Sequence, residues 1–170
     1  GVDRKEFLAR KFGSPQQYER MIEALIITGK SEGINFALDK IQRTPNSANS
    51  HRLVRLARTI GAESVAVNAL FSAYFERGLD IGDTETLILL AEEIGLDKSL
   101  ATTHLYSEGD LNAVFNENAR MHRIGITGVP CYIFNDSKAI AGAQEPEIIT
   151  RMIDMTFTQD ADSPALQSTG

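Results

Sequence analysis

Apolar residues in the first two thirds of the chain recur at the spacing of α-helices. Ser14, Pro15 and Gln17 together are typical of a helix start. The apolar period after them is about 3.6 residues. This period predicts an amphipathic helix. Its apolar stripe consists of Tyr18, Met21, Ile22, Leu25 and Ile26. We expect Asp3 to cap the N-terminus of a shorter helix that ends at Gly13.

Glycines divide the rest of this part of the chain into segments. Their periodicity predicts four helices, near residues 48–60, 63–77, 84–94 and 110–124. Before them, residues 34–38 predict a short extended piece and residues 44–47 predict a turn. One of the helices carries an aromatic stripe, which we interpret as core packing rather than a cofactor site: Leu70, Phe71, Tyr74 and Phe75.

The pattern changes in the last third of the chain. The β-branched and aromatic run Cys131–Phe134 predicts a strand, residues 135–138 predict a hairpin turn, and residues 139–141 predict the return strand. A final helix is expected from Pro146, and residues 159–170 are expected to be a disordered tail. Because a lone hairpin is only marginally stable in water, we expect the sheet to be incomplete without a further partner.

Composition narrows the functional classes. The 170 residues carry a formal charge of -6 and no clustered Lys or Arg, so nucleic acid is not an expected partner. No apolar run approaches the roughly 18 residues that span a bilayer, so no membrane partner is expected. A single cysteine, Cys131, excludes a disulfide framework within the chain and favours a cytoplasmic location.

Three kinds of chemically active residue are candidates for a site. We interpret Cys131 as a small buried hydrophobe on its strand, because no activating base is fixed beside it in the sequence. No metal site is expected, since the histidines lack ligand spacing: His51, His104 and His122. The acidic loop of Asp80, Gly82 and Asp83 has no EF-hand spacing, and Asp83 is placed to cap the helix after it.

Several segments resemble a known family. The segment GITGVPCYIF, followed eight residues after Phe134 by GAQ, resembles the end of a DsbA-type thioredoxin-like domain, in which a cis-proline loop leads into a strand. RTPNSANSHRL and LFSAYFERGLDIGD resemble the helical insertion of FrnE-like members. The 2-hydroxychromene-2-carboxylate isomerases share similar features. The resemblance runs from Asp3 to about Met155.

The resemblance implies an α/β thioredoxin-like fold with a large helical insertion, here mostly α-helical with a C-terminal β-hairpin and closing helix. It implies one domain over residues 1–158, with the insertion over about 14–124 and the thioredoxin part over about 125–158. It also implies thiol–disulfide oxidoreduction by a Cys-x-x-Cys helix. That helix and its flanking strands would precede Gly1, so we expect a truncated chain without catalytic residues, cofactor or activity of its own.

The resemblance also implies a binding site. Pro130 matches the cis-proline of the family, and the backbone of Val129 matches the position that pairs with an extended peptide or thiol substrate. Asn46, His51 and Arg52 match a segment beside the family's active-site groove. The alternative for Asn46 is an Asx-turn, with Ser47 or Asn49 capping the following helix.

Two other functions stay open. In the isomerase branch, a serine would replace the cysteine and glutathione would be the cofactor, near Asn46, His51 and Arg52. Alternatively, the chain is a non-catalytic binding or assembly module. The open sheet edge beside Cys131–Phe134 would then accept a strand from another chain, as a homodimer or by strand exchange.

Overall fold

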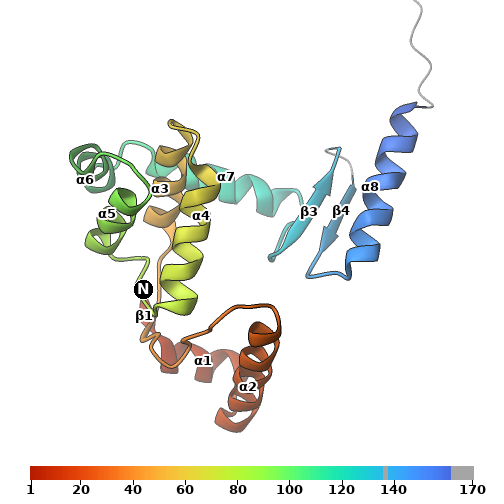
Figure 1. Cartoon of the computed structure of the whole chain (residues 1–170), viewed down its shortest axis with the longest axis horizontal. Coiled ribbons are helices and arrows are strands. Elements are labelled where there is room, and N and C mark those ends of the chain that lie inside the picture. Colours follow the sequence, from red (N-terminus) through yellow and green to blue (C-terminus); the bar gives the residue numbers. More distant parts are fainter. Residues whose placement is uncertain (136–137, 162–170) are drawn as a thin grey trace, which may run out of the picture. The chain divides into compact units, whose positions relative to one another are not determined.

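The computed structural model describes residues 1–135 and 138–161 (Figure 1). The chain divides into two compact units, with the boundary between Asn116 and Glu117. The first unit is helical apart from two very short strands, and the second contains a hairpin and a helix.

Two helices form the N-terminal part of the first unit. They are α1 (Arg4–Phe12) and α2 (Pro15–Ser31), and they pack against each other. Both predicted caps are confirmed, because Asp3 accepts a hydrogen bond from the Glu6 amide at 3.0 Å and Ser14 accepts one from the Gln17 amide at 3.4 Å. These caps satisfy amide groups that the first helical turn leaves unpaired.

The connection after α2 differs from the expectation. Residues 34–38, predicted as extended, form turns and irregular structure instead. Here the ring of Phe36 lies against Gly29, and the Ala37 amide donates to the carbonyl oxygen of Phe75 at 2.8 Å. The strands of this unit are β1 (Val2–Asp3) and β2 (Arg43–Thr44), an antiparallel pair too short to leave a pattern in the sequence.

Four helices enclose the main core: α3 (Ala48–Arg58), α4 (Glu63–Phe71), α5 (Thr84–Glu93) and α6 (Lys98–Tyr106). Their largest buried side chains include Leu53, Leu87 and Leu90. The helix α6 was not predicted, because its threonines interrupt the apolar period. Asp97, which accepts from the Leu100 amide at 2.8 Å, was the cap that could have indicated it.

The predicted helix over residues 63–77 continues beyond α4 as a π-helical segment, η1 (Ser72–Glu76). The aromatic stripe is core packing only in part. Leu70 is buried and Tyr74 contacts Phe75 edge to face, whereas the side chain of Phe71 is 59% exposed. The extra residue per turn of the π-helix shifts the aromatic positions relative to an α-helical stripe.

The helix α7 (Leu111–Arg123) begins in the first unit and ends in the second. The second unit then contains β3 (Cys131–Phe134), β4 (Lys138–Ala141) and α8 (Pro146–Ala161). The hairpin is antiparallel as predicted (Figure 1). The helix α8 packs against β3. Residues 159–161, expected in a disordered tail, belong to α8, and the rest of that predicted tail lies outside the described residues.

Candidate functional site

The loop before β3 exposes the residue that the sequence singles out. The Val129–Pro130 peptide bond is cis, as the resemblance implies. The side chain of Val129 is 92% exposed. Within the described part of the chain, the backbone N–H and C=O of Val129 make no hydrogen bond. This residue therefore presents two unpaired backbone groups to solvent at the start of a strand.

The register of the hairpin shows which way the backbone of β3 faces. The Gly142 amide donates to the carbonyl oxygen of Pro130 at 2.8 Å, so the ladder begins with the pair of Pro130 and Gly142. In an antiparallel ladder, hydrogen-bonded and non-hydrogen-bonded pairs alternate. The pair of Cys131 and Ala141 is therefore non-hydrogen-bonded, and the pair of Tyr132 and Ile140 is hydrogen-bonded.

This alternation defines the outer edge of β3, which consists of the backbone groups of Cys131 and Ile133. All of them point away from β4. No other strand pairs with this edge among residues 1–135 and 138–161. Proline has no N–H to donate, but Pro130 faces β4, so it removes no donor from the outer edge.

The side chains around the outer edge are apolar and uncharged. Residues 129–134 read VPCYIF. Tyr132 and Ile133 are 38% and 45% exposed, and the thiol-bearing Cys131 is half-buried. The interpretation of Cys131 as a structural residue stays a prediction. Over the described ranges, no group of three or more His, Cys, Asp or Glu residues could hold a metal ion.

Two members of the second candidate group, Asn46, His51 and Arg52, make hydrogen bonds within the chain. Asn46 accepts a hydrogen bond from the Ala48 amide at 3.0 Å, which confirms the Asx-turn. Ser47 stands at the N-cap of α3 without a side-chain bond to the helix, and Asn49 donates to Thr84 and accepts from Arg52. The expectation that either one caps α3 by its side chain is therefore wrong.

Arg52 is a buried structural residue, with 2% of it exposed. Its guanidinium donates to Asp110 Oδ1 at 2.6 Å, to Asn49 Oδ1 at 2.9 Å and to the Leu105 carbonyl at 3.0 Å. It also donates to the His104 carbonyl and to Ser107 Oγ. Every nitrogen of the guanidinium therefore has a hydrogen-bond partner within the chain. His51, the next residue back on α3, is exposed.

The carboxylate of Asp110 is the partner that sequence reasoning missed. Burial raises its pKa. The opposing effects outweigh burial and hold the pKa below its ordinary value: the hydrogen bond from Arg52, the charges of His104 and Arg52, and the bond from Arg55. His104 Nε2 lies 3.4 Å from Asp110 Oδ2 without a hydrogen bond. No signal in the sequence pairs Asp110 with an arginine 58 positions earlier.

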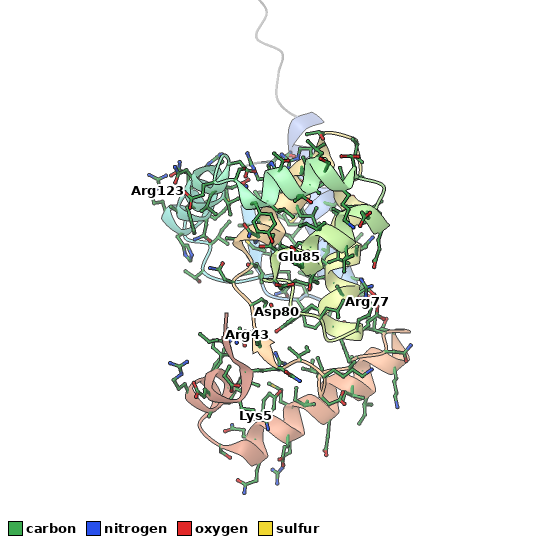
Figure 2. All side chains as sticks on the ribbon, turned by 90° about the vertical axis from the view of Figure 1, so that its left-hand side faces the viewer. Lys5, Arg43, Arg77, Asp80, Glu85 and Arg123 are labelled. Atoms are coloured by element: carbon green, nitrogen blue, oxygen red, sulfur yellow. The ribbon has the colours of Figure 1, made fainter. Side chains whose placement is uncertain are left out.

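The acidic loop before α5 is structural, as expected for Asp83. Its carboxylate accepts from the Thr86 amide at 2.9 Å and so caps α5. Asp80 accepts from the Gly82 amide at 2.9 Å and lies 3.6 Å from Arg43 Nε (Figure 2). A hollow of about 350 Å³ elsewhere on the surface is lined by α8 alone and includes none of the predicted site residues.

Comparison with known proteins identifies the family. A sequence model of the DSBA-like thioredoxin domain matches residues 1–154. The chain belongs to this family. It is also 33% identical over 88 residues to the uncharacterized protein YwbO of Bacillus subtilis, an alignment that covers 49% of this chain and 42% of YwbO. The chain thus spans less than half the length of that relative.

A solved structure shows the same fold. The crystal structure of a probable DsbA oxidoreductase from Streptomyces coelicolor superposes with a TM-score of 0.84 and 22% sequence identity. The superposition covers 99% of this chain and 71% of the other. The thioredoxin-like α/β fold with a large helical part, a C-terminal hairpin and a closing helix is therefore confirmed. Among the described residues, no helix is long and apolar enough to cross a membrane.

Proposed function

We propose that this chain supplies the peptide-binding part of a cytoplasmic thiol–disulfide oxidoreductase. One observation carries the proposal: Val129, beside the cis-proline, presents an unpaired N–H and C=O at the open edge of a strand. Family membership supports the reaction class. A disulfide-exchange centre needs two thiols, and the 170 residues contain one cysteine.

The binding step is the addition of an extended segment to a sheet edge. A substrate segment in a β conformation would donate to the carbonyl of Val129 and accept from its amide, as in other cases of β-augmentation. Each such bond contributes only about 0.5–1.5 kcal/mol net, so binding is weak and largely independent of sequence. This suits a protein that acts on unfolded chains, because an unfolded chain offers unpaired backbone along its whole length.

The apolar surroundings favour the same class of ligand. The exposed side chain of Val129 and the partly exposed Tyr132 and Ile133 offer contacts for apolar side chains of a bound segment. No charged side chain lies within residues 129–134, so the edge does not select by charge. We therefore expect reduced, unfolded polypeptide to bind and the folded form of the same polypeptide not to bind.

The test is a binding titration with carboxymethylated insulin B chain, which is unfolded and has no free thiol. Wild-type chain should bind it with a dissociation constant of order 0.1–1 mM, as a few backbone hydrogen bonds predict. Val129→Pro removes the amide donor and should weaken binding about tenfold. Val129→Ala keeps the donor and should bind within about twofold of wild type.

The two substitutions separate backbone from side-chain recognition. Because Val129 is exposed, neither change disturbs a buried contact, and circular dichroism should show the same helix content in both variants. Equal loss in both would assign the affinity to the side chain and contradict the proposal. Unchanged binding in both would place the peptide elsewhere.

A further inference from the structure

A peptide group in the turn after β4 is hydrogen-bonded on both sides. It links Ala141 to Gly142. Its N–H, which belongs to Gly142, donates to the carbonyl oxygen of Pro130 at 2.8 Å. Its C=O, which belongs to Ala141, accepts from Nε2 of Gln144 at 3.0 Å. We propose that Gln144 is a positioning residue, which fixes this peptide group and through it the loop that presents Val129. The inference deepens the proposed function and rests on it.

The two hydrogen bonds lie on opposite sides of the peptide group. Cys131 and Ala141 form a non-hydrogen-bonded pair, so the C=O of Ala141 points away from β3. The N–H of Gly142 points toward the start of β3, where it meets Pro130. Because a peptide group is planar, its C=O and N–H turn together. A rotation that breaks the bond from Gln144 therefore also misaligns the bond to Pro130.

The bond from Gln144 also strengthens the bond to Pro130. When the C=O of a peptide group accepts a hydrogen bond, its N–H becomes a better donor, because the two bonds polarise the group in the same direction. The backbone of Gly142 makes this arrangement possible. Its φ is 82°, in the left-handed region that glycine adopts without strain. The chain turns back there, so the half-buried side chain of Gln144 reaches the carbonyl three residues before it.

The direction of the Val129 backbone depends on how firmly Pro130 is held. The side chain of Val129 is 92% exposed, so side-chain packing does not fix this residue. The carbonyl of the next residue, Pro130, is the point at which the loop is bonded to the other side of the hairpin. A firmer bond there leaves the N–H and C=O of Val129 with fewer orientations. Binding of an extended segment then costs less conformational entropy.

The test compares wild-type chain with two variants of the full chain. Gln144→Leu removes the donor and keeps a side chain of similar size, whereas Gln144→Lys keeps an N–H donor. In Gln144→Leu, the Gly142 amide should exchange with deuterium at least about threefold faster than in wild type, as measured by NMR. Carboxymethylated insulin B chain should bind this variant about threefold more weakly. Gln144→Lys should bring both values to within about twofold of wild type.

Two further measurements distinguish positioning from general stabilisation. The exchange of the Tyr132 amide and the midpoint of urea unfolding should be the same in Gln144→Leu as in wild type. If both change together with the Gly142 amide, Gln144 stabilises the whole hairpin, and the positioning role is overturned. Wild-type affinity for the peptide in Gln144→Leu would also overturn this role and leave the proposed function standing. If wild-type chain binds no peptide, the proposed function fails and this role fails with it.

Discussion

Arg52 and Asp110, on different elements of the first unit, form a short, almost fully buried ion pair. Arg52 Nε donates to Asp110 Oδ1 at 2.6 Å, with 2% of the arginine side chain and 21% of the aspartate side chain exposed. Arg52 lies on α3 and Asp110 directly precedes α7, while the same guanidinium binds two carbonyls of α6. The pair therefore joins α3, the end of α6 and the start of α7.

Arg52→Ala should reduce the free energy of unfolding by about 3–5 kcal/mol. Removing one partner leaves the Asp110 carboxylate buried without its main donor, and it also leaves the α6 carbonyls unpaired. Urea unfolding followed by circular dichroism measures the loss. The matched control is Lys98→Met, which removes an exposed ion pair with Glu92 and should leave the midpoint unchanged. An Arg52→Ala midpoint equal to that of wild type would show that the pair is not structural.

The lowered pKa of Asp110 predicts a pH dependence with a definite sign. Because the pKa is lower in the folded state than the ordinary 3.8, Asp110 contributes stability that is present above about pH 4 and is lost as the pH falls through the folded-state pKa. Asp110→Asn removes this contribution. The difference in unfolding free energy between wild type and Asp110→Asn should therefore be present at pH 5 and shrink below pH 4. If the difference in unfolding free energy instead grows as the pH falls, the ionised Asp110 does not stabilise the fold.

Gly29→Ala tests the contact between α2 and the segment after it. An alanine normally stabilises a helix interior by about 0.5–1 kcal/mol relative to glycine. At Gly29 its Cβ would lie 2.5 Å from Cδ2 of Phe36, so the Phe36 ring must move. That ring contacts Phe75 edge to face at a centroid distance of 6.0 Å. We expect net destabilisation in thermal unfolding, and restored or increased stability in the double variant with Phe36→Leu.

The thiol of Cys131 should not support catalytic turnover. A disulfide exchange cycle needs a second thiol to resolve the mixed disulfide, and the sequence provides one cysteine. The chain should reduce insulin in the presence of dithiothreitol no faster than its Cys131→Ser variant. Faster turnover by wild type would assign a catalytic role to Cys131, and would require a different mechanism from the one proposed here.

Short sequence patterns predicted the elements that are stabilised by contacts between residues close together in the chain. The caps at Asp3, Ser14 and Asp83 follow from side chains that bond amides three residues away, and the hairpin follows from a β-branched run beside a turn. The helix α6 was missed because Thr102 and Thr103 interrupt its apolar period. Phe71 was expected in the core, but its ring is exposed at the end of α4, where the π-helical segment begins.

Contacts between distant residues could not be predicted from one sequence. Arg52 was a groove candidate because it matched a family segment. Only the fold shows that its guanidinium donates hydrogen bonds to Asp110 and to the end of α6. The outer edge of β3 required the register as well. The sequence singled out Val129, but the direction of the backbone groups of Cys131 and Ile133 follows from the bond between Gly142 and Pro130.

The most direct test of the binding proposal is amide hydrogen exchange of β3, measured by NMR with and without carboxymethylated insulin B chain at a chain concentration where it is monomeric. Val129, Cys131 and Ile133 donate to no group of β4, so their amides should exchange about tenfold more slowly once peptide is bound. Tyr132 and Phe134, already bonded to β4, should change little. Unchanged exchange at Val129 in the presence of saturating peptide would contradict the account.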